Sequence, residues 1–279
     1  MTDRADHGFA YLPPAAAGLG HIFARPKWIA AACIVALTAL GWVALGIMTL
    51  GESGLADALS QLCRAPAGTQ ASVPLVGAMW TAMVLAMMLP SAAPMILTYA
   101  EIADTAARKG EHVVSPLVLA AGYTFIWLGF SSIATLAQVL LAWVAVLDTD
   151  VAAGVLFSGA IFIAAGVYQF SALKHACLRQ CQNPFPFFFA NWATSPRGVF
   201  RLGVKQGMFC VGCCWAMMLV MLAVGVMNVI WMVGLGIVMA VEKLGAGRWF
   251  TRAMGAVLIA AGAAFILSGF AAHWPGHPI

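Results

Sequence analysis

The sequence predicts an all-α fold, a polytopic transmembrane helix bundle of about seven helices with a cytoplasmic N-terminus and a periplasmic C-terminus. Two observations predict the fold class. Of the 279 residues, 63% are hydrophobic and only 9% are charged, whereas soluble domains are about 45–50% apolar and about 25% charged. The apolar residues also fall into runs of roughly 20 or more, the length that crosses a bilayer. We therefore expect an integral membrane protein in contact with the lipid bilayer.

Seven apolar runs define the expected spans, all within one transmembrane domain at 28–272. A cytoplasmic tail (1–27) precedes this domain, and an exterior tail (273–279) follows it. The connection at 174–205 is crowded with Phe, Trp and Pro. Because aromatic residues favour the membrane–water interface, we expect an interfacial cytoplasmic loop there. The spans are 28–50, 74–99, 116–147, 151–173, 206–225, 229–245 and 250–272.

Lysine and arginine residues predict the orientation of the helices, since they concentrate in cytoplasmic loops. With seven spans and the N-terminus inside, all of the 14 basic residues except Arg64 lie on the cytoplasmic side. We therefore expect a multi-pass membrane protein with its N-terminus inside and its C-terminus outside. The net charge of +4 is spread over the loops and forms no single basic patch, which argues against nucleic acid as a partner.

The polar content of the spans limits the mechanisms that are open to the protein. Away from their ends, the spans contain no Asp, Glu, Lys, Arg or His, the residues that usually mark proton relays at membrane depth. The chain also lacks a GxxxxGK[ST] phosphate-binding loop. The sequence therefore argues against a proton-driven carrier that uses a carboxylate switch. It also argues against a built-in ATP motor.

The fifth span offers sulfur instead. Its stretch "GMFCVGCCWAMM" (207–218) places Cys210, Cys213, Cys214 and Met217 at positions i, i+3, i+4 and i+7. These positions lie on one face of an α-helix. The spacing therefore predicts a stripe of three thiols and a thioether along the fifth helix.

Two further segments are expected to face this stripe. The second span contains "MWTAMVLAMMLPSAAPM" (79–95), whose methionines flank two prolines at the depth of the stripe. Just beyond the fourth span, "KHACLRQC" (174–181) places two thiols four residues apart, beside a histidine. These segments contribute Met87, Met88, Met95, His175, Cys177 and Cys181.

The type of ligand indicates which metal ions fit. Thiolate and thioether ligands select soft ions, Cu(I) above all, while zinc remains open through Cys₃His or Cys₄ ligation. Thiols on the cytoplasmic side stay reduced, which favours metal or redox chemistry over structural disulfides. We therefore predict a metal site, with Cu(I) favoured, formed by Cys210, Cys213, Cys214, Met217, Cys177, Cys181, His175, Met87, Met88 and Met95.

Three blocks of the sequence resemble the signature segments of an uncharacterised bacterial family of predicted metal-binding integral membrane proteins. The blocks are 79–95, "YQFSALKHACLRQC" (168–181) and 207–218. The resemblance extends from the second span onward and implies a membrane protein that handles a metal. By this resemblance, the motif positions are Met87, Met88, Pro90, Pro94, Met95, Tyr168, Gln169, Lys174, Cys177, Cys181, Cys213 and Cys214.

The leading hypothesis is an inner-membrane protein that binds or translocates Cu(I), with a metal-delivering or metal-accepting protein as a further partner. Storage, assembly and sensing fit the same residues. A membrane thiol–disulfide oxidoreductase is an alternative, because Cys210 and Cys213 have C-x-x-C spacing. The cost of a thiolate inside hydrocarbon weighs against this enzyme. A structural subunit without metal is a second alternative.

Several polar residues have simpler expected roles. Lys174 and Arg179 are expected to anchor a helix end to lipid headgroups. Gln138 and Gln169 are expected to hydrogen-bond between helices and receive no ligand role. Cys33 lies in the first span, away from the other thiols, and is expected to be a small buried apolar residue.

Overall fold

The computed structural model describes residues 26–50, 73–145, 151–224 and 229–272, and these residues are helical apart from short connections. The predicted all-α class is confirmed for this part of the chain. The tails, apart from Pro26 and Lys27, lie outside the described residues, as do Cys63 and Arg64. The described helices are α2 (Pro26–Leu50), α4 (Val73–Arg108), α5 (Pro116–Ala145), α6 (Val151–Tyr168), α7 (Ala172–Gln182), α8 (Pro184–Ala190), α9 (Pro196–Val224), α10 (Val229–Lys243) and α11 (Arg248–Ala272).

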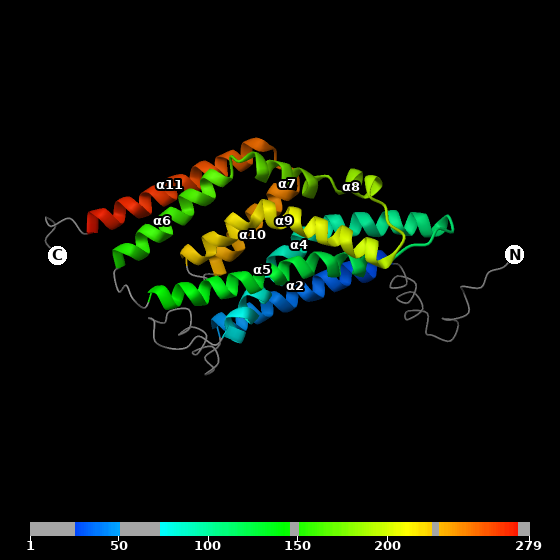
Figure 1. Ribbon diagram of the computed structural model, residues 1–279, viewed down its shortest axis with the longest axis horizontal. Coiled ribbons are helices and arrows are strands. Elements are labelled where there is room, and N and C mark those ends of the chain that lie inside the picture. Colours follow the sequence, from blue (N-terminus) through cyan, green and yellow to red (C-terminus); the bar gives the residue numbers. More distant parts are fainter. Residues whose placement is uncertain (1–25, 51–72, 146–150, 225–228, 273–279) are drawn as a thin grey trace.

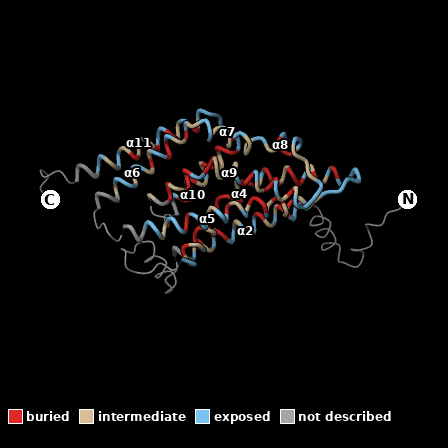
Figure 2. The backbone as a smooth tube through the Cα atoms, viewed as in Figure 1, coloured by how far each residue is buried: buried red, intermediate tan, exposed pale blue. Residues whose placement is uncertain are grey.

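Helices α4 and α9 form the centre of the bundle (Figure 1). Helix α4 packs on α2 and α5, while α9 packs on α5, α6 and α7. Helix α10 contacts both α4 and α9, and α11 pairs with α6 at one side. Figure 2 shows the buried residues gathered on the central helices, while few residues of α2 and α11 are buried. A side chain on the inner faces of α4, α9 and α10 is therefore enclosed by protein.

Two glycines allow α5 and α9 to approach backbone to backbone. A Cβ atom on Gly203 would lie 2.1 Å from the carbonyl oxygen of Leu119, and one on Gly122 would lie 2.2 Å from a carbonyl oxygen of α9. No real side chain fits at these distances, so only glycine permits this contact. The close approach brings Tyr123 of α5 against Cys210 of α9.

The fourth predicted span ends earlier than expected, and the segment after it is mostly helical. The chain bends by 66° between Val155–Tyr168 and Ala172–Gln182. Ser171 caps α7, since its side chain accepts a hydrogen bond from the backbone N–H of Lys174 at 3.1 Å. Helices α7 and α8 and the start of α9 then occupy most of the expected loop at 174–205. The bend turns α7 onto α9.

Five of the described helices are long and apolar enough to cross a membrane: α2, α4, α5, α9 and α11. The bent pair α6–α7 forms a sixth if it is counted as one span. Helix α10 has 15 residues, fewer than the roughly 20 that a full span needs. The predicted count of seven spans is therefore not confirmed. The outer faces nevertheless carry large apolar side chains, such as Ile133 at 69% exposure and Leu140 at 66%.

Candidate metal centre

Three cysteines of α9 form a compact group inside the bundle. The Sγ atoms of Cys210, Cys213 and Cys214 lie within 4.8 Å of one another, and all three residues are buried. The sulfurs of Cys213 and Cys214 are 3.3 Å apart. The shared face predicted from the i, i+3, i+4 spacing is confirmed for these residues.

Helix α7 adds a fourth thiol. The Sγ atom of Cys181 lies 4.0 Å from that of Cys213, a contact that joins segments 32 residues apart. We call Cys181, Cys210, Cys213 and Cys214 the sulfur cluster. Each of its members is a free thiol. The presence of a fourth thiol in the sulfur cluster therefore depends on the packing of α7 against α9.

The other two predicted ligands of α7 lie differently. Cys177 packs against Gly212, because a Cβ on that glycine would lie 2.7 Å from the cysteine sulfur. His175 lines a separate pocket together with Arg179 and Arg248. The structure thus places Cys181 in the sulfur cluster and Cys177 beside α9. His175 lies at another surface.

The predicted methionines are buried around the cluster but are not equivalent. Met88 of α4 is linked to the cluster through Lys243, because its Sδ atom lies 4.0 Å from the Lys243 ammonium group, which also contacts Cys210. Met87 packs on Gly236 of α10. Met217 accepts a hydrogen bond from the Gln169 side chain at 3.0 Å, so Gln169 does link two segments, as predicted. Met95 is also buried, further along α4.

Tyr123 and Lys243 contact the cluster and were not predicted from the sequence. The Tyr123 hydroxyl lies 3.0 Å from Cys210 Sγ and donates to the carbonyl oxygen of Met88 at 3.2 Å. The Lys243 ammonium group donates to Cys210 Sγ at 3.0 Å and to the Ser91 hydroxyl at 2.6 Å. Sequence reasoning treated Lys243 as an end-of-span charge. The sequence feature that could have pointed to this contact is a lysine in the last turn of a short apolar helix.

A buried ion pair, Lys174 with Glu242, lies next to Lys243. The Lys174 ammonium group lies 2.7 Å from Glu242 Oε2, and the two side chains are 0% and 2% exposed. The expected contact of Lys174 with lipid headgroups is therefore wrong, because this side chain reaches inward from α7 to α10. Gln182 donates to the carbonyl oxygen of Glu242 at 2.7 Å and adds a second link. These bonds tie the helix that carries Cys181 to the helix that carries Lys243.

The arrangement is suited to a soft cation. It combines three buried thiols, the half-buried thiol of Cys181, a methionine and a lysine ammonium group, and buried thiolates need a compensating charge. The Glu242 carboxylate, on the residue before Lys243, is paired with Lys174 through Oε2, while its buried Oε1 has no hydrogen-bond partner among the described residues. The donor set therefore favours soft metal ions over hard ions such as Mg²⁺ or Ca²⁺.

Comparison with known proteins agrees with this chemistry. Residues 77–265 match a protein-family model described as PpoB2, a copper chaperone. The chain belongs to this copper chaperone family. The match confirms the predicted resemblance to a metal-related family and includes every residue of the sulfur cluster, together with Met88, Tyr123 and Lys243. No curated protein and no solved structure matched the chain.

Proposed function

We propose that this protein is a membrane-embedded copper chaperone that holds Cu(I) in the sulfur cluster and transfers it to a partner protein. The observation that carries the proposal is the buried group of three thiols on α9 in a member of a copper chaperone family. In this reading copper is the cargo, and Cys210, Cys213 and Cys214 are its principal ligands. Cys181 and Met88 complete the set of nearby donors.

The family match and the nearby methionines favour Cu(I) as the cargo. The four thiols of the sulfur cluster would also satisfy the Cys₄ set that holds structural zinc, but thioether ligands suit Cu(I) and not zinc. Here a methionine and a lysine ammonium group lie beside the thiols. The buried methionines of α4 and α9 also include Met83 and Met221, and these offer weaker soft donors further along the same helices. We infer that the ion moves between thioether and thiolate ligands during transfer.

The proposed setting is a bacterial inner membrane, with the N-terminus cytoplasmic and the C-terminus periplasmic. Five helices of sufficient length and apolar character support this setting. The outward-facing apolar side chains support it too, because soluble proteins rarely expose such extended apolar surfaces. Burial of the copper site inside the bundle would then shield Cu(I) from water and from oxidants on either side.

The test is metal analysis of the full chain purified in detergent and loaded anaerobically with Cu(I) or with Zn²⁺. We expect bound copper to fall by at least half in Cys210→Ser, Cys213→Ser and Cys214→Ser. Cys33→Ser is the matched control, since Cys33 is a free thiol on α2 outside the cluster, and it should bind as the wild type does. Unchanged copper in the cluster variants would refute the proposal, and a preference for zinc would refute the choice of metal.

The same preparation addresses the oxidoreductase alternative. Thiol alkylation followed by mass spectrometry reports whether Cys210 and Cys213 are reduced or oxidised in cells. A chaperone predicts reduced thiols that copper protects from alkylation. Reversible oxidation of this pair that does not depend on metal would support the enzyme instead.

A further inference from the structure

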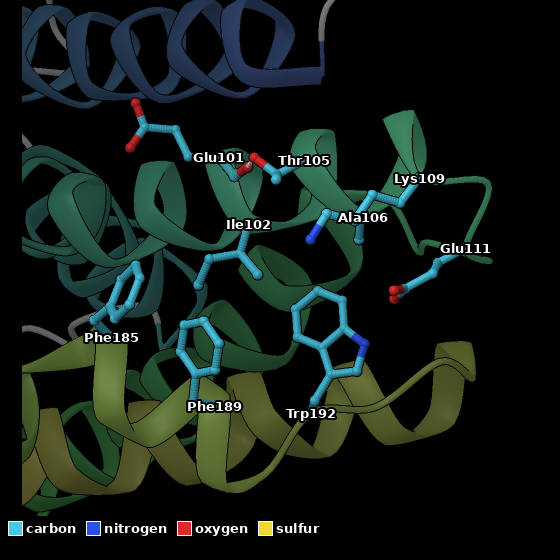
Figure 3. A pocket seen from close by; sticks show the side chains of 9 residues that line it. All are labelled: Glu101, Ile102, Thr105, Ala106, Lys109, Glu111, Phe185, Phe189 and Trp192. Carbon is cyan, nitrogen blue, oxygen red and sulfur yellow. Dashed lines mark hydrogen bonds between the residues drawn. The ribbon is translucent and has the colours of Figure 1, made fainter.

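A second feature lies at the end of α4, in a pocket that the copper site does not use. The pocket has a volume of about 430 Å³ and lies between the last turns of α4, the turn after them and α8 (Figure 3). Binding pockets for small molecules commonly occupy about 300–1,000 Å³. The space is therefore large enough for a headgroup and the start of an acyl chain.

One wall of the pocket is aromatic and firmly supported. Phe185 and Phe189 of α8 are 54% and 64% exposed, and both line the pocket with Trp192. Behind them, Phe188 is fully buried and packs edge-on against Tyr99 of α4, with ring centroids 5.4 Å apart. The same tyrosine stacks on Trp192 at 5.7 Å. The wall is thus held in place without any ligand.

The opposite rim carries two charges of opposite sign. Figure 3 shows the Lys109 ammonium group and the Glu111 carboxylate reaching toward the space beside Trp192. Neither side chain has a hydrogen-bond or ion-pair partner among the residues that the structure describes. The third charged residue, Glu101, is paired with Lys27. The pocket therefore offers one unpaired cation, one unpaired anion and an apolar wall.

We propose that this pocket binds a zwitterionic phospholipid whose headgroup ends in a primary ammonium, as in phosphatidylethanolamine. Its phosphate lies at Lys109, its ammonium lies at Glu111, and the start of an acyl chain lies along Phe185 and Phe189. An anionic lipid offers no cation to the Glu111 carboxylate. The aromatic wall and the end of a long apolar helix both suit the membrane–water interface. The inference rests on the proposed membrane setting but not on the copper site.

The test uses tryptophan fluorescence, because brominated acyl chains quench tryptophans that they touch. The full chain, stripped of lipid in detergent, is titrated with dibrominated phosphatidylethanolamine or dibrominated phosphatidylglycerol. The signal of Trp192 is the difference between wild type and Trp192→Phe. Trp249→Phe is the matched control, since Trp249 lies on α11, is 80% exposed and does not line the pocket.

We expect phosphatidylethanolamine to quench Trp192 at a concentration at least fivefold lower than phosphatidylglycerol, and Trp249 to show no such preference. Glu111→Gln should abolish the preference, while Lys109→Met should weaken binding of both lipids. Quenching of Trp249 without quenching of Trp192, or equal quenching of Trp192 by both lipids, would overturn the pocket assignment. If neither tryptophan is quenched after the protein is reconstituted into vesicles of either brominated lipid, the membrane setting itself is wrong.

Discussion

Replacing Lys243 by Met tests how the sulfur cluster balances its charge. A metal centre with two or more thiolates and one Cu(I) ion carries net negative charge, which is costly in a buried site. The Lys243 ammonium group lies 3.0 Å from Cys210 Sγ and is 8% exposed. In the proposed copper site, this ammonium group would supply the positive charge that offsets the buried thiolates.

The size of the effect follows from this distance. Two unit charges separated by 3.0 Å interact by about 5.5 kcal/mol at an effective dielectric constant of about 20. Part of this energy cancels, because the ammonium group also contacts Cys210 in the metal-free protein. We expect a net loss of about 1.5–3 kcal/mol in copper binding, equivalent to a rise in Kd of about 10- to 150-fold.

The assay is anaerobic competition between the detergent-purified protein and a chromophoric Cu(I) chelator. Lys243→Arg keeps the charge and should stay close to wild type. Lys205→Met removes an exposed lysine from α9, the cysteine helix, and should leave Kd unchanged. Tighter copper binding in Lys243→Met would refute the reasoning, because it would mean that the ammonium group competes with the metal for the thiols.

Two further predictions concern the packing that builds the site. Gly203→Ala should lower the free energy of unfolding by about 1–3 kcal/mol, because its Cβ would meet a backbone oxygen of α5 at 2.1 Å. Gly129→Ala has open space and should be neutral or slightly stabilising, so equal melting temperatures for the two variants would contradict this account. Lys174→Met should cost about 3–5 kcal/mol by leaving the Glu242 carboxylate buried without its partner. The double variant Lys174→Met with Glu242→Leu should recover much of that loss in thermal unfolding, and no recovery would show that the ion pair is not the cause.

Helix α9 shows which part of the site can be predicted from the local sequence pattern. The group of Cys210, Cys213 and Cys214 could be predicted because helical periodicity places i, i+3 and i+4 on one face. Cys181 was predicted as a ligand from its motif, but its 4.0 Å contact with Cys213 requires the 66° bend after Tyr168. The sequence pattern did not predict that bend, because the apolar run continues past it.

His175 and Lys243 show what the sequence pattern does not determine. His175 stands two residues before Cys177, so on a helix the two side chains point in nearly opposite directions. Nearness in sequence favoured it as a ligand, whereas the structure places it in another pocket. Lys243 is 33 residues from Cys210, and its contact with that thiol arises only because α10 packs between α4 and α9.

By itself, the sequence determined the helical class, the apolar character and the row of thiols, because these depend on composition and on the 3.6-residue period. The family match rests on the same linear information. Only the tertiary structure decided which helices surround the thiols, that Tyr123 and Lys243 reach them, and that Lys174 points inward to Glu242. The physical reason is that burial and charge pairing depend on contacts between segments that are distant in the sequence. A local pattern does not predict which distant segment makes each contact.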